Sequence, residues 1–320
     1  MSERTLPAGP WQTLFPQALR LIDEIAEHGG KKDPFFTFGG GTVLMLRHQH
    51  RMSKDIDIFV PDPQSLGFVT PRLSEIAEEI CNAKYVEAAN YVKLFREEGE
   101  IDFVASPNLL PDEHAFERWD LFGRSVRVES SAEIVAKKMY HRGAEATARD
   151  LFDLALVIER EPSALTHAES FMYRHLDAFT DNLKAPSERY IAQFNSIETL
   201  DYNPSLEQAV SVATAYLGGL RATREKSAEE AASFIAAHGL AVQPLDLRKG
   251  EYCGAILHRT EHHLVQDVGR STAVVHQLQN LPQSLKTAAV GEASIKLRYA
   301  QGSAAIVNRP AREASKGLEH

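Results

Sequence analysis

The sequence predicts an α+β protein in three parts. Helical and strand patterns mix over residues 1–160, helical patterns dominate residues 161–238, and residues 239–310 show the alternation of β-strands. The chain has 320 residues, of which 43% are hydrophobic and 25% charged, enough to bury sizeable cores in two or three domains. We therefore expect a mixed core domain, a helical domain and a small β module.

Composition excludes several classes of protein. No apolar stretch approaches the roughly 18 to 20 residues of a membrane span, and the first residues lack the organisation of a signal peptide, so we expect a cytoplasmic protein without membrane contact. Cys81 and Cys253 are too sparse for a disulfide framework or a thiolate zinc site. The net charge of -9 argues against nonspecific coating of nucleic acid. Residues 318–320, Leu-Glu-His, resemble the start of an expression tag.

The first elements follow from spacing and turn residues. Apolar residues at helical spacing predict a helix over residues 11–29, which ends at a glycine pair suited to a C-cap. The pattern then predicts, in order, a strand at 35–38, a glycine turn, a helix at 43–48, a strand at 56–60, an amphipathic helix near 71–82, a hairpin of 91–96 and 100–104, and a strand at 126–128.

The later elements are helical and then β. Ser130 and Glu133 have the spacing of a capping box, and helix is predicted from there to about residue 238, with a break at 195–205. In residues 293–300 apolar and basic side chains alternate, so Leu297 and Tyr299 should face inward while Lys296 and Arg298 face solvent.

Two aspartates on one predicted strand are the first sign of chemistry. Asp55 and Asp57 are two residues apart, so both carboxylates project to the same face of the strand. A third carboxylate, Asp102, is flanked by apolar residues on a later strand, and the three would complete an oxygen-rich Mg²⁺ site. Two ions about 4 Å apart would activate an attacking hydroxyl and stabilise a leaving pyrophosphate.

The glycine turn before the second helix is the other sign. Gly40, Gly41 and Thr42 open a helix, and backbone N–H groups without side chains around them can approach a triphosphate closely. Each motif alone has a structural explanation, because paired aspartates are commonly solvated and glycine runs are commonly turns. Their order along the chain is more specific than either motif.

The segment GGTVLMLRHQHRMSKDIDIF resembles the opening motif of the AbiEii/AbiGii-type toxin nucleotidyltransferases, members of the DNA polymerase β-like superfamily. Gly41 and Thr42, followed by Asp55 and Asp57, match its Gly-Thr and D-x-D pattern, and Asp102 matches its third carboxylate. The resemblance spans about residues 35 to 160. It implies a polymerase β-like core with a mixed sheet and flanking helices, Mg²⁺ as cofactor, and a nucleoside triphosphate as donor.

The same resemblance implies a biological setting. Members of this class are toxins of toxin–antitoxin or phage-defence systems, and some transfer nucleotides to the acceptor ends of transfer RNA. It therefore implies an RNA acceptor and a cognate antitoxin. Two alternatives stay open: transfer to a protein or small molecule, and a non-catalytic, nucleotide-binding plasmid-maintenance protein.

Residues 133–157 resemble the family's lysine motif followed by its R-D-x-x-D-L motif, which makes Lys138 and Asp150 the counterparts. In one straight helix these residues would lie roughly 18 Å apart, too far to share a site. We therefore predict a break over residues 142–147, centred on Gly143, with Asp150 in the first turn of a new helix. Lys138 would then neutralise phosphate charge. The alternative is a surface lysine and an aspartate that interacts with the helix dipole.

Residues before the two aspartates also fit the family pattern. Arg51 either contacts phosphate or forms a structural salt bridge, and Ser53 either binds nucleotide or caps a turn. His48 and His50 are expected in a solvent-facing loop.

Residues 249–282 resemble the KfrB-type domain of plasmid-encoded proteins, and the match extends to about residue 307. The resemblance implies mobile-element biology. We expect residues 239–310 to form a small β barrel that recruits DNA or a protein partner. Arg270, Lys296 and Arg298 could form a nucleic-acid face, although a solvated strand face explains them equally well. Histidines are frequent here, but without cysteines beside them we do not expect zinc.

Overall fold

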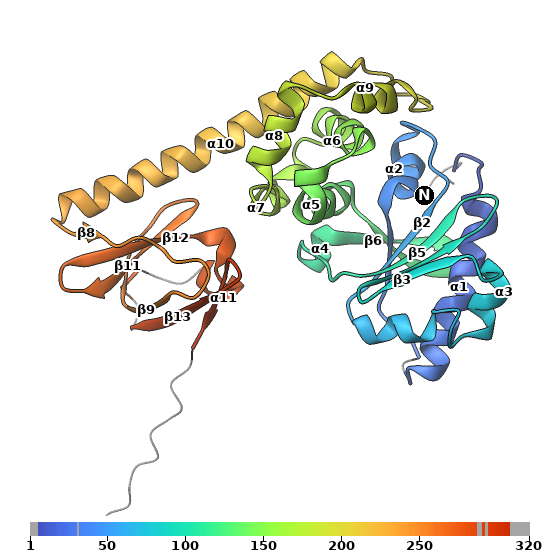
Figure 1. Cartoon of the computed structure of the whole chain (residues 1–320), viewed down its shortest axis with the longest axis horizontal. Coiled ribbons are helices and arrows are strands. Elements are labelled where there is room, and N and C mark those ends of the chain that lie inside the picture. Colours follow the sequence, from blue (N-terminus) through green and yellow to red (C-terminus); the bar gives the residue numbers. More distant parts are fainter. Residues whose placement is uncertain (1–5, 31, 287–289, 292–293, 308–320) are drawn as a thin grey trace, which may run out of the picture. The chain divides into compact units, whose positions relative to one another are not determined.

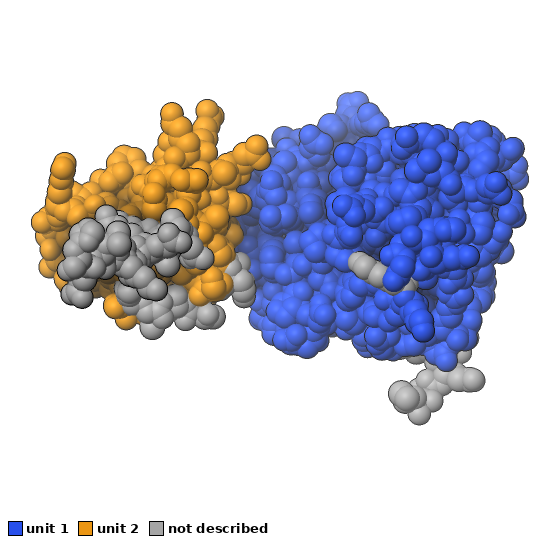
Figure 2. Space-filling view, turned by 90° about the horizontal axis from the view of Figure 1, so that it is seen from below, with its two compact units in different colours: residues 1–218 blue, residues 219–320 orange. Residues whose placement is uncertain are grey.

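The computed structural model describes residues 6–30, 32–286, 290–291 and 294–307, and the tag-like residues 318–320 lie outside these ranges. The chain divides into two compact units, residues 1–218 and 219–320 (Figure 2). The elements of the first unit are α1 (Trp11–His28), β1 (Thr37–Gly39), α2 (Gly40–His48), β2 (Ile56–Val60), η1 (Pro63–Phe68), α3 (Glu75–Cys81), β3 (Tyr85–Ala88), β4 (Tyr91–Phe95), β5 (Glu100–Ala105), α4 (Asp112–Ala115), β6 (Phe116–Leu121), β7 (Arg124–Glu129), α5 (Ser131–Arg142), η2 (Gly143–Glu145), α6 (Ala148–Arg160), η3 (Ala164–His167), α7 (Glu169–Met172), α8 (Leu176–Lys184) and α9 (Glu188–Asn195). The division into three domains with boundaries at residues 160 and 238 stays a prediction.

The first unit is built on a seven-stranded mixed sheet with the order β3-β4-β5-β2-β1-β7-β6. Strand β2 pairs in parallel with β5 and antiparallel with β1, and β1 in turn pairs in parallel with β7. Helices α1 and α3 lie together at the right of this sheet in Figure 1, and α5 lies at its left. The predicted α+β architecture with a mixed sheet and flanking helices is confirmed.

Register decides which side chains each face of the sheet carries. Phe38, Ile58 and Phe103 lie in one row across β1, β2 and β5, all fully buried. The ring of Phe15 on α1 lies 4.5 Å from the ring of Phe38, measured between centroids, so this face packs on α1. Because side chains alternate along a strand, the next row must point to the other face.

The helix break predicted from the Lys138–Asp150 distance is confirmed. Helix α5 ends at Arg142, a 3₁₀ turn follows from Gly143, and α6 begins at Ala148 with Thr147 as its N-cap. The predicted capping box at Ser130 is only half formed. Ser130 caps α5, but the Glu133 carboxylate accepts instead from the backbone N–H groups of Leu109 and Leu110, at 2.9 Å each.

Other elements differ from prediction in extent. Helix α2 begins at Gly40 rather than residue 43, because the glycine turn itself forms the first helical turn. The strands β3 and β6 were not predicted; they are the two edges of the sheet and their side chains are mostly exposed, so they lack an apolar alternation. The predicted break between helices is present, between the end of α9 at Asn195 and the start of a single helix, α10 (Leu206–Ala237).

The second unit consists of the C-terminal part of α10, from residue 219, and a β module that packs on it through Ala231 and Ile235. Its strands are β8 (Ala241–Val242), β9 (Glu251–Gly254), β10 (Ile256–Arg259), β11 (His263–Gly269), β12 (Thr272–Gln277), β13 (Ile295–Ala300) and β14 (Ser303–Ile306), with η4 (Leu278–Asn280) and α11 (Gln283–Lys286) between β12 and β13. They form a four-stranded and a three-stranded sheet. Leu297 and Tyr299 are 1% exposed and belong to the core of the module, and Arg298 between them is exposed, as predicted.

Histidines in this module serve its packing. His276 is buried, with Nδ1 2.9 Å from the Tyr299 hydroxyl and Nε2 3.0 Å from Gln266 Oε1. His263 Nδ1 lies 2.9 Å from Ser227 Oγ of α10. Both imidazoles are therefore bound within hydrogen-bond networks. Within the described ranges, no helix combines the length and the hydropathy that a transmembrane span requires.

Replacement of Leu297 by alanine should destabilise the β module by about 2 to 5 kcal/mol, because a buried side chain is lost and a cavity remains. Thermal unfolding followed by calorimetry measures this, with Arg298→Ala, at the exposed neighbouring position, as the control. Equal stabilities of the two variants would contradict the inward orientation of Leu297.

Candidate active site

The predicted carboxylates lie in the row opposite the α1 face. Asp57 on β2 stands in register with Asp102 on β5, and Asp102 with Lys93 on β4. On the other side Asp57 is in register with Gly39 of β1. The pairing of the sheet thus places two aspartates 45 residues apart in sequence on neighbouring strands, beside the glycine turn.

Asp55 lies one pleat earlier than Asp57. Its Oδ1 accepts a hydrogen bond from the backbone N–H of Glu100, at 3.1 Å, which ties the loop before β2 to the start of β5. Asp55 is partly exposed and lines a cavity beside Asp57 and Asp102. It therefore stands at the entrance to the row that Asp57 and Asp102 form.

The electrostatics of Asp57 and Asp102 show an excess of negative charge. Burial, together with Asp102 and Asp55, raises the pKa of Asp57 to about 7. Burial raises the pKa of Asp102 to about 6, although Lys93 Nζ lies 2.8 Å from Asp102 Oδ2 and opposes the shift. Asp102 Oδ1 is buried without a hydrogen-bond partner. The carboxylates of this site thus lack enough positive charge around them, and one of their oxygens, Asp102 Oδ1, has no hydrogen-bond partner.

A divalent cation would correct that imbalance, so the donor set fits a metal. Carboxylate oxygens are the ligands that Mg²⁺ prefers. Among the described residues, the group whose ligand atoms all lie within 4.8 Å of one another is Glu24, Glu27 and His28 on α1, on the other side of the sheet. Asp55, Asp57 and Asp102 are more widely spaced, and would have to converge on an ion.

Glycine is required where the turn meets the carboxylates. Gly40 has φ +72°, and a Cβ placed there would lie 1.9 Å from Asp57 Oδ2. At Gly39 a Cβ would lie 2.1 Å from Glu129 Oε2. The start of α2 therefore packs directly on the carboxylates, and any side chain would displace them.

Thr42 and Ser53 connect α2 to the strand that follows. The Thr42 hydroxyl is buried and donates to the backbone oxygen of Asp55, at 2.5 Å. It also lies 3.1 Å from the Ser53 hydroxyl. These contacts fix the position of Asp55. They give Thr42 a structural role, while Ser53 remains partly exposed to the site.

Lys138 and Asp150 are brought together by the break between α5 and α6. Lys138 Nζ lies 2.9 Å from Asp150 Oδ1, and Arg142 Nη2 lies 2.5 Å from the same oxygen. Asp150 also completes the capping box of α6 with Thr147. Although burial opposes it, Lys138 and Arg142 lower the pKa of Asp150 to about 2. Asp150 is thus an anchor for two cations as well as a helix cap.

A buried ion cluster lies beneath them. Asp153 is fully buried and accepts two hydrogen bonds from Arg51, at 2.7 and 2.8 Å, and its carboxylate also binds Lys138. His50 Nε2 lies 2.9 Å from Asp153 Oδ1, and the His50 side chain is 0% exposed. Arg51 therefore forms the structural salt bridge that was one of its two predicted roles.

The expectation of a solvent-facing loop at His48 and His50 is wrong. His50 is buried because its partner, Asp153, comes from α6, 103 residues away. His48 is 9% exposed and lies 2.9 Å from Ser131 Oγ on α5. Asp153 is the second aspartate of the R-D-x-x-D-L motif, and the motif alone does not predict its buried partners.

Two cavities meet at the aspartates. The first cavity, of about 390 Å³, is lined by Gly40, Phe59, Asn90, Ser106, Ile134, Lys137 and His141, among others. The second cavity, of about 400 Å³, is lined by Arg51, Ser53, Asp55, Lys93, Arg149, Gln193 and Ser196, among others. Both are lined by Asp57, Asp102, Lys138 and Arg142. In the described part of the chain, Gly41, Thr42 and Asp150 line neither.

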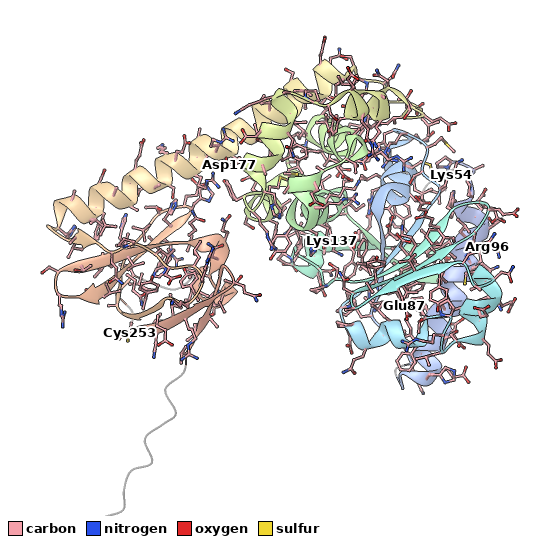
Figure 3. The ribbon with its side chains drawn as sticks, in the orientation of Figure 1. Lys54, Glu87, Arg96, Lys137, Asp177 and Cys253 are labelled. Atoms are coloured by element: carbon pink, nitrogen blue, oxygen red, sulfur yellow. The ribbon has the colours of Figure 1, made fainter. Side chains whose placement is uncertain are left out.

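Lys137, Glu129 and Phe59 also line the first cavity, and no sequence motif predicted them there. Lys137, labelled in Figure 3, extends from α5 so that its Nζ lies 2.6 Å from Glu129 Oε1 and 4.0 Å from the centroid of the Phe59 ring. Glu129 Oε2 is buried without a hydrogen-bond partner. Lys137 and Lys138 are neighbours on α5 but have different partners, because Lys138 binds Asp150 and Asp153 of α6.

Replacement of Asp153 by alanine should cost about 3 to 5 kcal/mol of stability, because Arg51 and His50 would be left buried without their carboxylate. Equilibrium unfolding in denaturant measures this loss. Asp120→Ala, at an exposed position of β6, is the control. A loss of less than 1 kcal/mol would show that the cluster does not hold α6 to the segment before β2.

Comparisons with known proteins agree with the motifs. A family model described as the nucleotidyl transferase AbiEii toxin of a type IV toxin–antitoxin system matches residues 24–215, and a model of the KfrB domain matches residues 251–308. No curated protein matches the chain.

Two solved structures are similar at low identity. A putative nucleotidyltransferase from H. pylori is 15% identical, with a TM-score of 0.39, over 69% of this chain and 98% of that chain. The CD-NTase CdnG of Bradyrhizobium diazoefficiens in complex with GTP is 14% identical, with a TM-score of 0.25, over 68% of this chain and 87% of that chain. The AbiEii match covers more than half of the chain, and with it the predicted resemblance is confirmed: this protein belongs to the AbiEii family of nucleotidyltransferase toxins and carries a KfrB domain at its C-terminal end.

Proposed function

We propose that the protein transfers a nucleoside monophosphate from a nucleoside triphosphate to a hydroxyl group of RNA, transfer RNA foremost, and releases pyrophosphate. The observation that supports this reaction is the Asp57–Asp102 pair, with Lys138 and Arg142, at the junction of two cavities. One cavity can hold the donor and the other the acceptor. The reaction would make the protein the toxin of a toxin–antitoxin or phage-defence system with a cognate antitoxin.

We assign Asp55, Asp57 and Asp102 to hold Mg²⁺. The raised pKa values of Asp57 and Asp102 and the unpaired Oδ1 of Asp102 support this assignment. When bound, Mg²⁺ would neutralise charge on the α-phosphate and on the leaving pyrophosphate.

The donor fits the first cavity. Gly40 lets the start of α2 approach phosphate oxygens without a side chain between them, and Lys138 and Arg142 supply positive charge at the same place. Phe59 and Ile134 offer apolar wall to the nucleoside. Asp150 and Asp153 hold Lys138 in position, so the lysine needs little ordering when the triphosphate binds.

A side chain of this protein can accept the proton that the acceptor hydroxyl loses during transfer. The acceptor oxygen attacks the α-phosphorus, a new P–O bond forms, and the bond between the α-phosphorus and the bridging oxygen breaks. Pyrophosphate leaves with the bonding electron pair. The hydroxyl proton passes to Asp102, and Lys93, whose Nζ lies 2.8 Å from Asp102 Oδ2, holds that side chain in place.

We place the protein in the cytoplasm, where nucleoside triphosphates and RNA are found. We also propose that the KfrB domain recruits a partner. Lys296 and Arg298 lie 2.8 and 2.5 Å from Glu251, which reduces the positive charge of this face and favours a protein over DNA.

Asp57→Asn should abolish transfer without unfolding the protein. The substitution removes a charge that its neighbours repel, so the melting temperature should stay equal or rise. Incubation with each labelled nucleoside triphosphate, Mg²⁺ and total RNA measures transfer, and Asp120→Asn, on an exposed edge strand, is the control. Transfer that persists in Asp57→Asn contradicts the assignment. Label on a protein or on a small molecule would show that the acceptor is not RNA. Nucleotide binding without transfer of label to any acceptor would indicate a non-catalytic regulator.

Gly40→Ala should lower the rate of transfer by roughly a hundredfold or more, because the new Cβ would collide with Asp57 Oδ2 and misplace it. Single-turnover transfer rates measure the effect. Gly67→Ala, where a Cβ would meet nothing within 4 Å, is the matched control. A Gly40→Ala enzyme as fast as that control would mean that the turn is not part of the site.

A further inference from the structure

The second cavity differs in chemistry from the first. Beyond the four residues that both cavities share, it is lined by polar and charged side chains, including Lys93, Arg149, Gln193 and Ser196. The apolar walls of the first cavity, such as Phe59 and Ile134, have no counterpart there apart from Ala148. Such a surface suits a sugar–phosphate chain better than a nucleobase.

Arg149 differs from the other cations of this cavity. Arg51 binds Asp153, Lys93 binds Asp102, and Lys138 and Arg142 bind Asp150. Arg149, in the first turn of α6, is exposed, and within the part of the chain that the structure describes it forms no ion pair. Its guanidinium is therefore available to a ligand that enters the cavity.

The far wall of this cavity is fixed to the core. Gln193 and Ser196 come from α9 and the turn after it. The segment that follows pairs with the residues before β2: Met52 N–H donates to the Glu198 oxygen at 2.8 Å, and Leu200 N–H to the His50 oxygen at 2.9 Å. These hydrogen bonds tie the wall formed by Gln193 and Ser196 to the residues before β2.

Direction of attack decides between the two cavities. In phosphoryl-group transfer the attacking oxygen and the leaving group lie roughly in line. If the triphosphate occupies the first cavity, against Gly40, the attacking hydroxyl needs a second space that reaches the same aspartates. The second cavity shares Asp57 and Asp102 with the first and also includes Asp55, so it meets this requirement.

We propose that the second cavity binds the 3′-terminal sugar–phosphate of an RNA acceptor, with Arg149 on a backbone phosphate and Gln193 and Ser196 beside it. This inference rests on the proposed function, because it needs RNA to be the acceptor. Arg149 is then a residue that binds the acceptor and leaves the donor untouched.

The test uses the full chain with a labelled donor and the RNA that accepts label. Arg149→Glu should raise the KM for RNA by about tenfold or more and weaken its dependence on salt, while the KM for the donor stays unchanged. Arg149→Gln should raise the KM for RNA less, because only the attraction is lost. Arg118→Glu makes the same charge change at an exposed site on the edge strand β6, and its KM values should equal those of the unmodified protein.

The outcomes separate the two proposals. RNA labelling with an unchanged KM for RNA in Arg149→Glu overturns this inference and leaves the proposed function standing. A rise in the KM for the donor of the same size also overturns it, because Arg149 would then bind the triphosphate. If the unmodified protein labels no RNA, the proposed function fails and this inference fails with it. Melting temperatures of the variants, expected to be unchanged at an exposed position, exclude misfolding as the cause.

Discussion

The parallel pairing of β2 with β5 is the constraint on which the site depends. It sets Asp57 beside Asp102, and in the same step sets Ile58 beside Phe103 on the opposite face. A shift of one residue would put the carboxylates against α1 and the apolar side chains in the cavities, so the fold cannot form in that register without burying unpaired charge. The hydrophobic core and the position of the aspartates are therefore one property of the sheet, and the glycine turn is confined to the small space that the Asp57 carboxylate leaves.

Four aspartates near one another acquire opposite electrostatic characters from their partners. Asp150 and Asp153 are surrounded by cations, and the pKa of each lies below its ordinary value. Asp57 and Asp102 are partly buried with too few cations, and the pKa of each is raised. The first pair is complete within the protein and contributes stability. The second pair is incomplete, which is the arrangement expected of groups that bind a ligand carrying positive charge.

Features that depend on local sequence patterns could be predicted from the sequence. The D-x-D strand, the glycine turn and the break at Gly143 follow from spacing and backbone chemistry, and the structure has all three. Predictions were wrong where a residue's contacts come from a segment that is distant in sequence. The sequence around His50 is typical of a loop, but His50 is buried because it bonds to Asp153 of α6. The spacing of Glu133 is typical of a capping box, but its carboxylate accepts instead from the backbone at residues 109–110. The edge strands were not predicted for another reason. Their side chains are exposed on both faces, so their sequences lack the alternation of apolar and polar residues that predicts a strand.

The helices after the core do more than cover it. The residues just before β2, Gln49 to Met52, are paired on one side with the segment after α9 and on the other with Asp153 of α6. The loop that positions Asp55 is therefore held by helices that come more than 90 residues later in the chain. A core without those helices would lack a wall of the second cavity and the clamp on Arg51 and Lys138. The family match, which continues to residue 215, includes these helices, as expected if the catalytic unit consists of the sheet and the helices together.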